Sequence, residues 1–119
     1  MDDLRLKRYR DKINYVIKSI RYLDDKPENE LEKRGIFYSL QTSIESIVNL
    51  IAMYVKDSGI PIMDDQQNIS EFVKLTNLDP LIEDELKKAN GMRNILVHRY
   101  NNVDDEIILS SIERVKSFY

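Results

Sequence analysis

Hydrophobic residues recur along the first half of the chain at alternating spacings of three and four, the pattern of helices packed in a bundle. One such stripe covers residues 2 to about 24 and precedes Pro27, and another covers about Glu30 to Lys56 and stops before Gly59. Their members are Leu6, Tyr9, Ile13, Val16, Ile20 and Leu23, then Phe37, Leu40, Ile44, Ile47, Ile51 and Tyr54. Proline cannot continue a helix and glycine often caps one, so the pattern predicts two long helices in an antiparallel hairpin.

The second half of the chain predicts shorter helices. Asn68 and Glu71 have the spacing of a capping box, which predicts a short helix from Ile69 to about Leu75. Asp79 suits an N-cap and Pro80 suits the first helical position, because a missing N–H costs nothing there. The apolar spacing that follows predicts a helix of about twenty residues.

A last helix is predicted after Asp104, a further N-cap, with the stripe Ile108, Ile112, Val115 and Tyr119. The second long helix also carries apolar residues off its main stripe, at Leu31, Ile36, Val48, Leu50 and Val55. Such a helix is central in a bundle or lies in a dimer interface. The fold class expected is all-α, an up-and-down bundle of four to five helices, in one domain of residues 1–119.

Composition agrees with this expectation and excludes several classes of protein. The 119 residues are 42% hydrophobic and 33% charged, with three glycines and three prolines, which is typical of a helical protein and not of a disordered one. The chain has no cysteine, so a disulfide framework, a thiolate nucleophile and a cysteine-ligated metal are excluded. The longest apolar segment, Ile44 to Val55, is too short to span a bilayer, and the charged N-terminus does not resemble a signal peptide. A cytoplasmic location is therefore expected.

The net charge of −3 provides no global attraction to nucleic acid, although a local basic patch could still bind phosphate. The first predicted helix has such a run, Arg5, Lys7, Arg8, Arg10 and Lys12. A solvated helix face is the simpler interpretation of this run, and a phosphate-contacting surface is the other.

Most catalytic motifs are missing. The sequence contains no glycine-rich phosphate loop, no His-Glu-x-x-His motif and no Ser-His-Asp set, and a single histidine cannot form a multi-histidine metal site. Paired acids, such as Asp64-Asp65, fall in predicted caps and loops, where carboxylates complement the helix dipole. Neither a metal nor a cofactor is therefore expected.

One stretch, residues 93–100, combines the only histidine with arginine, amide and tyrosine side chains: Arg93, Asn94, His98, Arg99 and Tyr100. Cations near the last turn of a helix also interact favourably with its free carbonyls, so an ordinary helix end is one interpretation. The functional interpretation is metal-independent cleavage of a phosphodiester, in which His98 moves a proton and Arg93 stabilises charge on phosphorus. Attack by a ribose 2′-hydroxyl would restrict the substrate to RNA.

In-line cleavage gains from both a base and an acid, but the chain has one histidine, about 140° around the helix from Arg93. A symmetric homodimer would bring two copies of the motif into one cleft. The site therefore predicts a homodimer.

The pattern Arg93-x4-His98-x-Tyr100, followed by Val103-Asp104, resembles the HEPN superfamily, specifically the HepT-like toxins of prokaryotic toxin-antitoxin pairs. The helical layout agrees along nearly the whole chain. The resemblance implies a dimeric, metal-independent endoribonuclease toxin that cleaves cellular RNA such as tRNA or mRNA. It implies catalytic roles for Arg93 and His98, with Asn94 as the polar residue after the arginine. It also implies that a MntA-like nucleotidyltransferase antitoxin neutralises the toxin by adding AMP to Tyr100.

An alternative of a different class is a noncatalytic module that binds a nucleotide or docks a nucleotidyltransferase, with Arg93 and His98 holding phosphate only. A purely structural helical bundle is the third interpretation.

Overall fold

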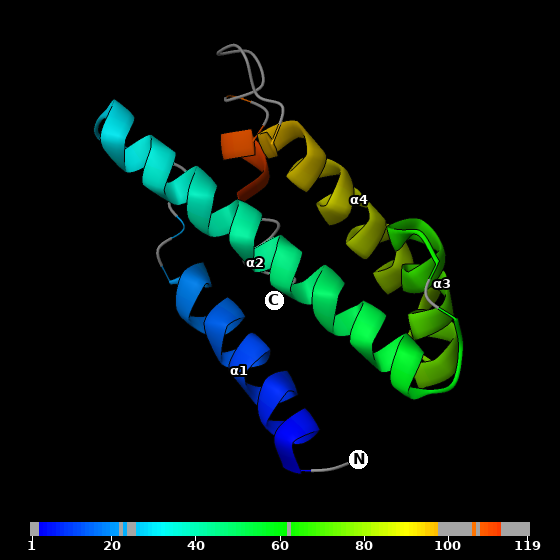
Figure 1. The fold of residues 1–119 in the computed structure, drawn as a ribbon. Helices are drawn as coiled ribbons and strands as arrows, with labels where there is room; N and C mark the ends of the chain where they lie inside the picture. Colours follow the sequence, from blue (N-terminus) through cyan, green and yellow to red (C-terminus); the bar gives the residue numbers. More distant parts are fainter. Residues whose placement is uncertain are drawn as a thin grey trace.

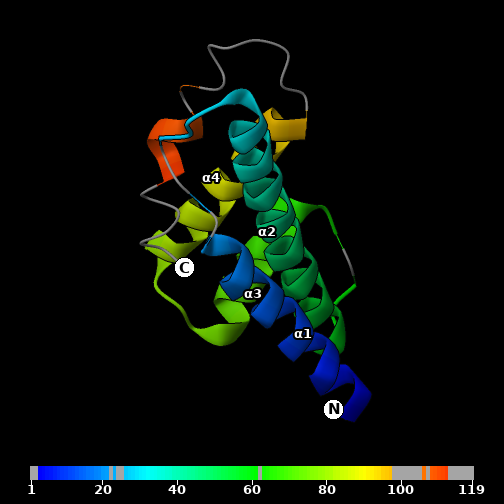
Figure 2. The same cartoon turned by 90° about the vertical axis from the view of Figure 1, so that its left-hand side faces the viewer.

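The computed structural model describes residues 3–21, 23, 26–61, 63–97, 106 and 108–112 and shows an all-α fold (Figures 1 and 2). Its long helices are α1 (Asp3–Ile20), α2 (Glu30–Asp57), α3 (Asp65–Thr76) and α4 (Pro80–Val97). Residues 108–112 are helical as well, and no strand occurs among the residues described. The predicted fold class is confirmed. None of the helices in these ranges has the length and apolar character that crossing a membrane requires.

Helix α2 is the centre of the arrangement. It packs against α1, α3 and α4, with α1 on one side and α4 on the other (Figure 1). Its off-stripe residues Ile36 and Val55 are buried, and Val48 packs against the core. The extra apolar surface of this helix is therefore explained by its central position in the bundle, which was one of the two interpretations; the other was a dimer interface. Leu31 differs from these residues because its side chain is exposed.

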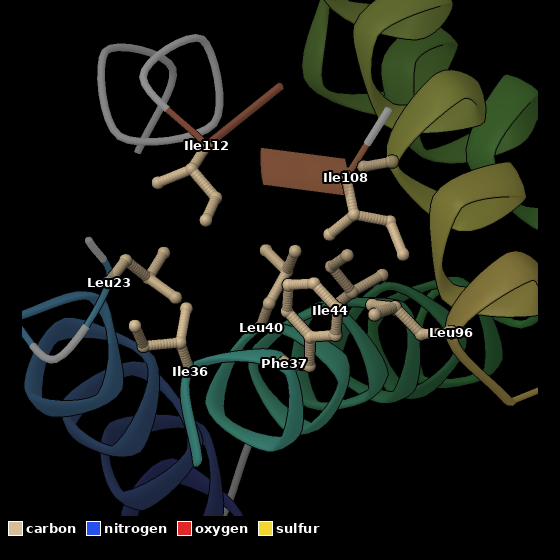
Figure 3. Close-up of a cluster of buried hydrophobic side chains, with 9 residues drawn as sticks. Leu23, Ile36, Phe37, Leu40, Ile44, Leu96, Ile108 and Ile112 are labelled. Atoms are coloured by element: carbon tan, nitrogen blue, oxygen red, sulfur yellow. The ribbon is translucent and has the colours of Figure 1, made fainter. Parts of the chain in front are cut away.

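Two apolar clusters hold α4 against α2. The first joins α2 to the end of α4 and to residues 108–112, and Figure 3 shows most of its side chains converging between these elements. Its members are Leu23, Ile36, Phe37, Leu40, Ile44, Ala89, Leu96, Ile108 and Ile112. The second joins α2, α3 and α4 through Ile51, Ile69, Val73 and Leu86. The end of α4 is therefore fixed by burial of Leu96, one residue before the described part of this helix ends.

Burial of Ile108 and Ile112 confirms the inner positions of the predicted last helix. Its predicted cap, Asp104, and the rest of its stripe, Val115 and Tyr119, lie outside the described residues.

Several helix ends follow the predicted chemistry. After α2, Gly59 has a φ of +85°, and its N–H donates to the Lys56 carbonyl at 3.0 Å while the Ile60 N–H donates to the Val55 carbonyl at 3.2 Å. These two bonds form a Schellman motif, which favours glycine because the left-handed conformation strains other residues. At the start of α4, the Leu81 N–H donates to Asp79 Oδ1 at 2.9 Å, which confirms Asp79 as the N-cap.

The start of α3 was predicted wrongly. The helix begins at Asp65, four residues before the predicted start at Ile69, and the Gln67 N–H donates to the N-cap Asp64 Oδ1 at 2.8 Å. Asn68 is no cap, because its buried side chain donates to the Met63 carbonyl and accepts from the Met63 N–H, both at 3.1 Å. Asp64 and Asn68 are both suitable caps and lie about one turn apart in the sequence. In the folded chain Asn68 closes the loop before the helix, and Asp64 is the cap.

Helix α1 also departs from the prediction, which extended it to about residue 24. It ends at Ile20, and Leu23 is buried in the core beyond the helix end. Its stripe is only partly covered, since Leu6 is 40% and Ile13 is 46% exposed. The reason is one-sided packing, because α1 packs mainly against α2 while α3 and α4 cover the other side of that helix.

A carboxylate clamp joins the start of α1 to the end of α2 and confirms their antiparallel arrangement. Arg5 donates to both oxygens of Asp57, from Nε to Oδ2 at 2.8 Å and from Nη2 to Oδ1 at 2.9 Å. The Tyr9 hydroxyl donates to Asp57 Oδ2 at 2.8 Å. The hydrogen bonds from Arg5 and then Tyr9 hold the pKa of Asp57 below its usual range. Burial, followed by the bond to Asp57, raises the pKa of Tyr9 to about 12.

Candidate active site around Arg93

The described part of the predicted site lies in the last turns of α4. Arg93 and Asn94 belong to this helix, whereas His98, Arg99 and Tyr100 lie outside the described residues. The Arg93 side chain is 26% exposed, and Asn94 is exposed. The helix therefore holds an arginine partly inside the protein and an amide on its surface, next to each other in the chain.

The guanidinium of Arg93 is held by two oxygen atoms from different helices. Its Nη2 donates to Asp65 Oδ2 at 3.1 Å and to Asn90 Oδ1 at 3.4 Å. Asp65 is the first residue of α3, and Asn90 is buried one turn before Arg93 on α4. An arginine with two acceptors on one terminal nitrogen keeps donors on its other nitrogens, because the guanidinium carries five N–H groups in a planar fork.

The Nε of Arg93 is buried and has no hydrogen-bond partner within the part of the chain that the structure describes. Most buried polar groups in proteins have a partner, because an unpaired donor pays its desolvation cost without compensation. The arginine thus has a fixed position, a buried Nε without a partner, and an Nη1 that forms no hydrogen bond with a described residue. The fixed position and the Nη1 donors suit a group that binds an anionic oxygen during a reaction.

Asp65 is a site residue that sequence reasoning missed. The acid pair Asp64-Asp65 was predicted to belong to a cap or a loop, which is correct for Asp64, the N-cap, and wrong for Asp65, the first residue of α3. The ion pair of Asp65 with Arg93 spans 28 positions in the chain and depends on the packing of α3 against α4. No spacing in the sequence indicates it.

The surface of α4 near Asn94 carries exposed apolar side chains and one glycine. Ile95 and Val97 are large exposed hydrophobic residues. A Cβ added to Gly91, one turn before Asn94 and Ile95, would meet no other atom within 4 Å. This surface could accept a closely packed helix, since glycine allows two backbones to approach.

No group of three or more metal-ligating side chains occurs within residues 3–97 and 106–112 as far as these are described. Asp65, the carboxylate that contacts Arg93, is engaged with that cation.

A family model described as Ribonuclease HepT-like matches residues 6–117. The chain belongs to this family. Two relatives come from Archaeoglobus fulgidus, and each is named "Putative RNase". One is 43% identical over 114 residues, covering 96% of this chain and 86% of the relative. The other is 33% identical over 112 residues, covering 93% of this chain and 82% of the relative.

A third relative, from Methanocaldococcus jannaschii and named as an RNase in the same way, is 38% identical over 86 residues, covering 69% of this chain and 91% of its own length. No solved structure matches the chain. Membership of the HepT-like family confirms the resemblance found in the residues from Arg93 to Tyr100 and assigns the chain to a class of enzymes, the endoribonucleases.

Proposed function

We propose that this HepT-like chain is a metal-independent endoribonuclease whose site combines Arg93 and His98 from two copies of the chain. The observation that carries the proposal is the fixed guanidinium of Arg93, held by Asp65 at 3.1 Å while its Nη1 forms no hydrogen bond with a described residue and keeps its donors for a substrate. Phosphate is the matching ligand, because a guanidinium can donate two parallel hydrogen bonds to it.

In the proposed reaction, His98 removes the proton from a ribose 2′-hydroxyl, and the 2′-oxygen attacks the adjacent phosphorus. The bond from phosphorus to the 2′-oxygen forms and the bond to the 5′-oxygen breaks, which leaves a 2′,3′-cyclic phosphate and a free 5′-hydroxyl. A second imidazole, His98 of the partner subunit, gives a proton to the leaving 5′-oxygen. Arg93 stabilises the negative charge that develops on the phosphoryl oxygens.

We assign Asp65 to a positioning role. Its carboxylate holds Nη2 of Arg93 from a second helix, so the rotation of the arginine side chain does not depend on α4 alone. Catalysis is sensitive to such positions because a displacement of about 1 Å can reduce the rate about a hundredfold. Asn94 is exposed beside Arg93, where it can bind the substrate or the partner.

The dimer is proposed to form across the exposed end of α4. The apolar residues Ile95 and Val97 and the open space at Gly91 favour a helix-to-helix contact there. A contact at this position would bring two copies of the motif together, which is what a site with one histidine per chain requires.

We further propose that the enzyme is a toxin acting on cytoplasmic RNA and that a MntA-like nucleotidyltransferase antitoxin neutralises it by adding AMP to Tyr100. Support comes from the position of Tyr100, two residues after His98, because AMP there would add negative charge and bulk beside the substrate phosphate. Incubation with the antitoxin and ATP is expected to increase the mass of the wild-type chain and not that of Tyr100→Phe.

The ribonuclease proposal is tested by incubating purified protein with total RNA in a chelator, beside His98→Ala and Arg93→Ala. The wild type should produce 2′,3′-cyclic phosphate ends, and either substitution should lower the rate by about 100-fold or more. Equal integrity of the RNA with wild type and His98→Ala would contradict it. If the wild type then still bound nucleotide, the noncatalytic binding module would be the better interpretation.

A further inference from the structure

The strongest feature outside the Arg93 site is the charge of α1. Helix α1 carries six lysine and arginine residues and two aspartates, a surplus of four positive charges, whereas the whole chain has a net charge of −3. The remainder of the chain is therefore strongly acidic, and α1 is a basic helix on an acidic protein. Such a distribution creates a local positive field that the net charge conceals.

A groove between α1 and α2 gathers several of these cations. It has a volume of about 530 Å³ and is lined by Arg5, Arg8 and Lys12 of α1 and by Lys56 of α2, with one acid, Asp11. Arg5 is engaged with Asp57. Arg8, Lys12 and Lys56 form no ion pair with any residue in the described ranges, so their charges are available to a ligand.

The cationic surface continues along α1 beyond this groove. The lining of a second depression includes Tyr15, Lys18 and Arg21, and that of a third, near the start of the helix, includes Arg5, Lys7 and Arg8; Asp11 is the one acid in each. At about 1.5 Å per residue, the 18 residues of α1 extend over about 27 Å. The lysines and arginines of α1 lie between Arg5 and Lys18, a length of about 20 Å, which fits a polymer of phosphates because a single phosphate would occupy only one of the depressions.

Tyr15 gives this row a flat apolar surface. Its side chain is 42% exposed, and its hydroxyl donates to Thr42 Oγ1 of α2 at 2.7 Å, which fixes the orientation of the ring. Sites for single-stranded nucleic acid combine a positive groove with aromatic rings on which bases stack. An acidic polypeptide would use the cations but has no need of an exposed, oriented ring.

We propose that the groove between α1 and α2, with the continuing surface at Tyr15, binds the sugar-phosphate backbone of single-stranded RNA. This inference rests on the proposed ribonuclease function and extends it. Helices α1 and α4 lie on opposite sides of α2 (Figures 1 and 2), so α1 binds RNA at a distance from Arg93 of the same chain. Helix α1 therefore contacts parts of a long substrate away from the bond that is cleaved.

The test measures binding of a labelled single-stranded RNA of about 20 nucleotides by fluorescence anisotropy, in the His98→Ala background. Arg8→Glu with Lys12→Glu should weaken binding by tenfold or more. If the wild-type residues make two phosphate contacts, the slope of log affinity against log salt should also fall by about 1.4. The matched control is Lys74→Glu with Lys88→Glu, which changes the same charge at exposed positions of α3 and α4.

Tyr15 is tested separately. Tyr15→Leu should weaken binding of the single strand by about fivefold or more, while Tyr15→Phe, which keeps the ring and loses the bond to Thr42, should retain most of it. Thermal melts by circular dichroism identify any variant that fails to fold. In that case the milder pair Arg8→Gln with Lys12→Gln is used, and the expected loss is about threefold or more.

Equal losses in the α1 and control variants would overturn the inference, because they would show an effect of total charge. No loss in the α1 variants would overturn it too, and so would binding of polyglutamate as tight as that of RNA. In the His98-containing protein, the ratio of long-RNA to dinucleotide cleavage should fall with the α1 substitutions. Binding that depends on α1 without any cleavage by wild type would support this inference while contradicting the nuclease proposal.

Discussion

The two sides of α2 differ in how far the side chains there are covered and paired. On the side of α4, apolar side chains are covered, as Leu40 is by the end of α4 and residues 108–112, and Arg93, the arginine proposed for catalysis, is held by Asp65. On the side of α1, apolar residues such as Ile13 are nearly half exposed, and Arg8 and Lys12 have no ion-pair partner among the residues described.

This difference matches two kinds of task. Chemistry on phosphorus needs a donor fixed to within a fraction of an ångström, and burial of neighbouring side chains provides that. Binding a long, flexible anion needs many weak contacts in the open, where water and salt can exchange. The covered side of α2 is therefore suited to catalysis and the open side to substrate capture.

The largest expected effect is a difference in unfolding stability between substitutions on the two sides of α2. Leu40→Ala, at a fully buried position, should lower the free energy of unfolding by about 2–5 kcal/mol, because it removes packed atoms and leaves a cavity. Leu4→Ala on α1, 78% exposed, should change it by less than about 0.5 kcal/mol. Urea denaturation measures both. A loss above about 1 kcal/mol at Leu4 would show that α1 is covered in solution and would break the comparison.

The next effect concerns the fixed arginine. Asp65→Asn keeps the shape of the side chain and removes its charge, so it should lower kcat/KM on RNA by about ten- to a hundredfold. Unfolding stability should change by less than about 1 kcal/mol, since the pair is partly exposed.

The control for this prediction is Asp84→Asn, at an exposed position of α4, which should leave cleavage as it is. Partial recovery with Asp65→Glu would support a positioning role. Wild-type kcat/KM in Asp65→Asn would show that Arg93 finds its position without the carboxylate.

A third prediction addresses the clamp that holds α1. Asp57→Asn should lower the pKa of Tyr9 from about 12 toward its ordinary value, although only in part, because burial is the larger cause of the shift. Titration of the tyrosine resonances by NMR, with Tyr9→Phe to assign Tyr9, measures this. An unchanged pKa would mean that the bond to Asp57 contributes nothing in solution.

The same clamp gives a dependence of stability on pH. The folded-state pKa of Asp57 is lowered, so its contribution is complete above the unfolded pKa, about 3.9, and is lost as the pH falls through the lowered value. The folded-state pKa of Tyr9 is raised, so its contribution is complete below about pH 10 and is lost as the pH rises toward 12. In Asp57→Asn the acid dependence due to Asp57 should disappear and the alkaline dependence due to Tyr9 should be weaker.

The smallest effect compares two helical glycines. An added Cβ meets nothing within 4 Å at either Gly35 of α2 or Gly91 of α4, so alanine at each should raise the stability of the single chain by about 0.5–1 kcal/mol. Gly91→Ala should in addition weaken the proposed dimer, because Gly91 lies beside Asn94 and Ile95. Sedimentation at micromolar concentration distinguishes the two variants. An equally stable dimer in both variants would show that the dimer interface does not include the surface of α4 at Gly91.

Local signals were sufficient for most of the fold. The three-four spacing located α2, and glycine in a left-handed conformation at Gly59 and the cap at Asp79 marked helix ends, because each depends on contacts within a few residues. The start of α3 failed for the opposite reason. Asp64 and Asn68 are both good caps, and only the loop that Asn68 closes on Met63 decides between them.

The candidate site was also predicted in part. Residues from Arg93 to Tyr100 carried enough chemistry and resemblance to identify the family, and the structure describes Arg93 and Asn94 of that set. Asp65 could not be found, since an acid in the first turn of a helix has an ordinary explanation in the helix dipole.

The sequence by itself determined the helical elements, the family and the residues proposed for chemistry, because periodicity, caps and a compact motif are written within short stretches of chain. Only the tertiary structure decided which residues meet. It placed Asp65 on Arg93, left the stripe of α1 half covered, and gathered cations in the groove beside α2. These outcomes depend on how helices pack against one another, and helix packing brings together residues that no local spacing relates.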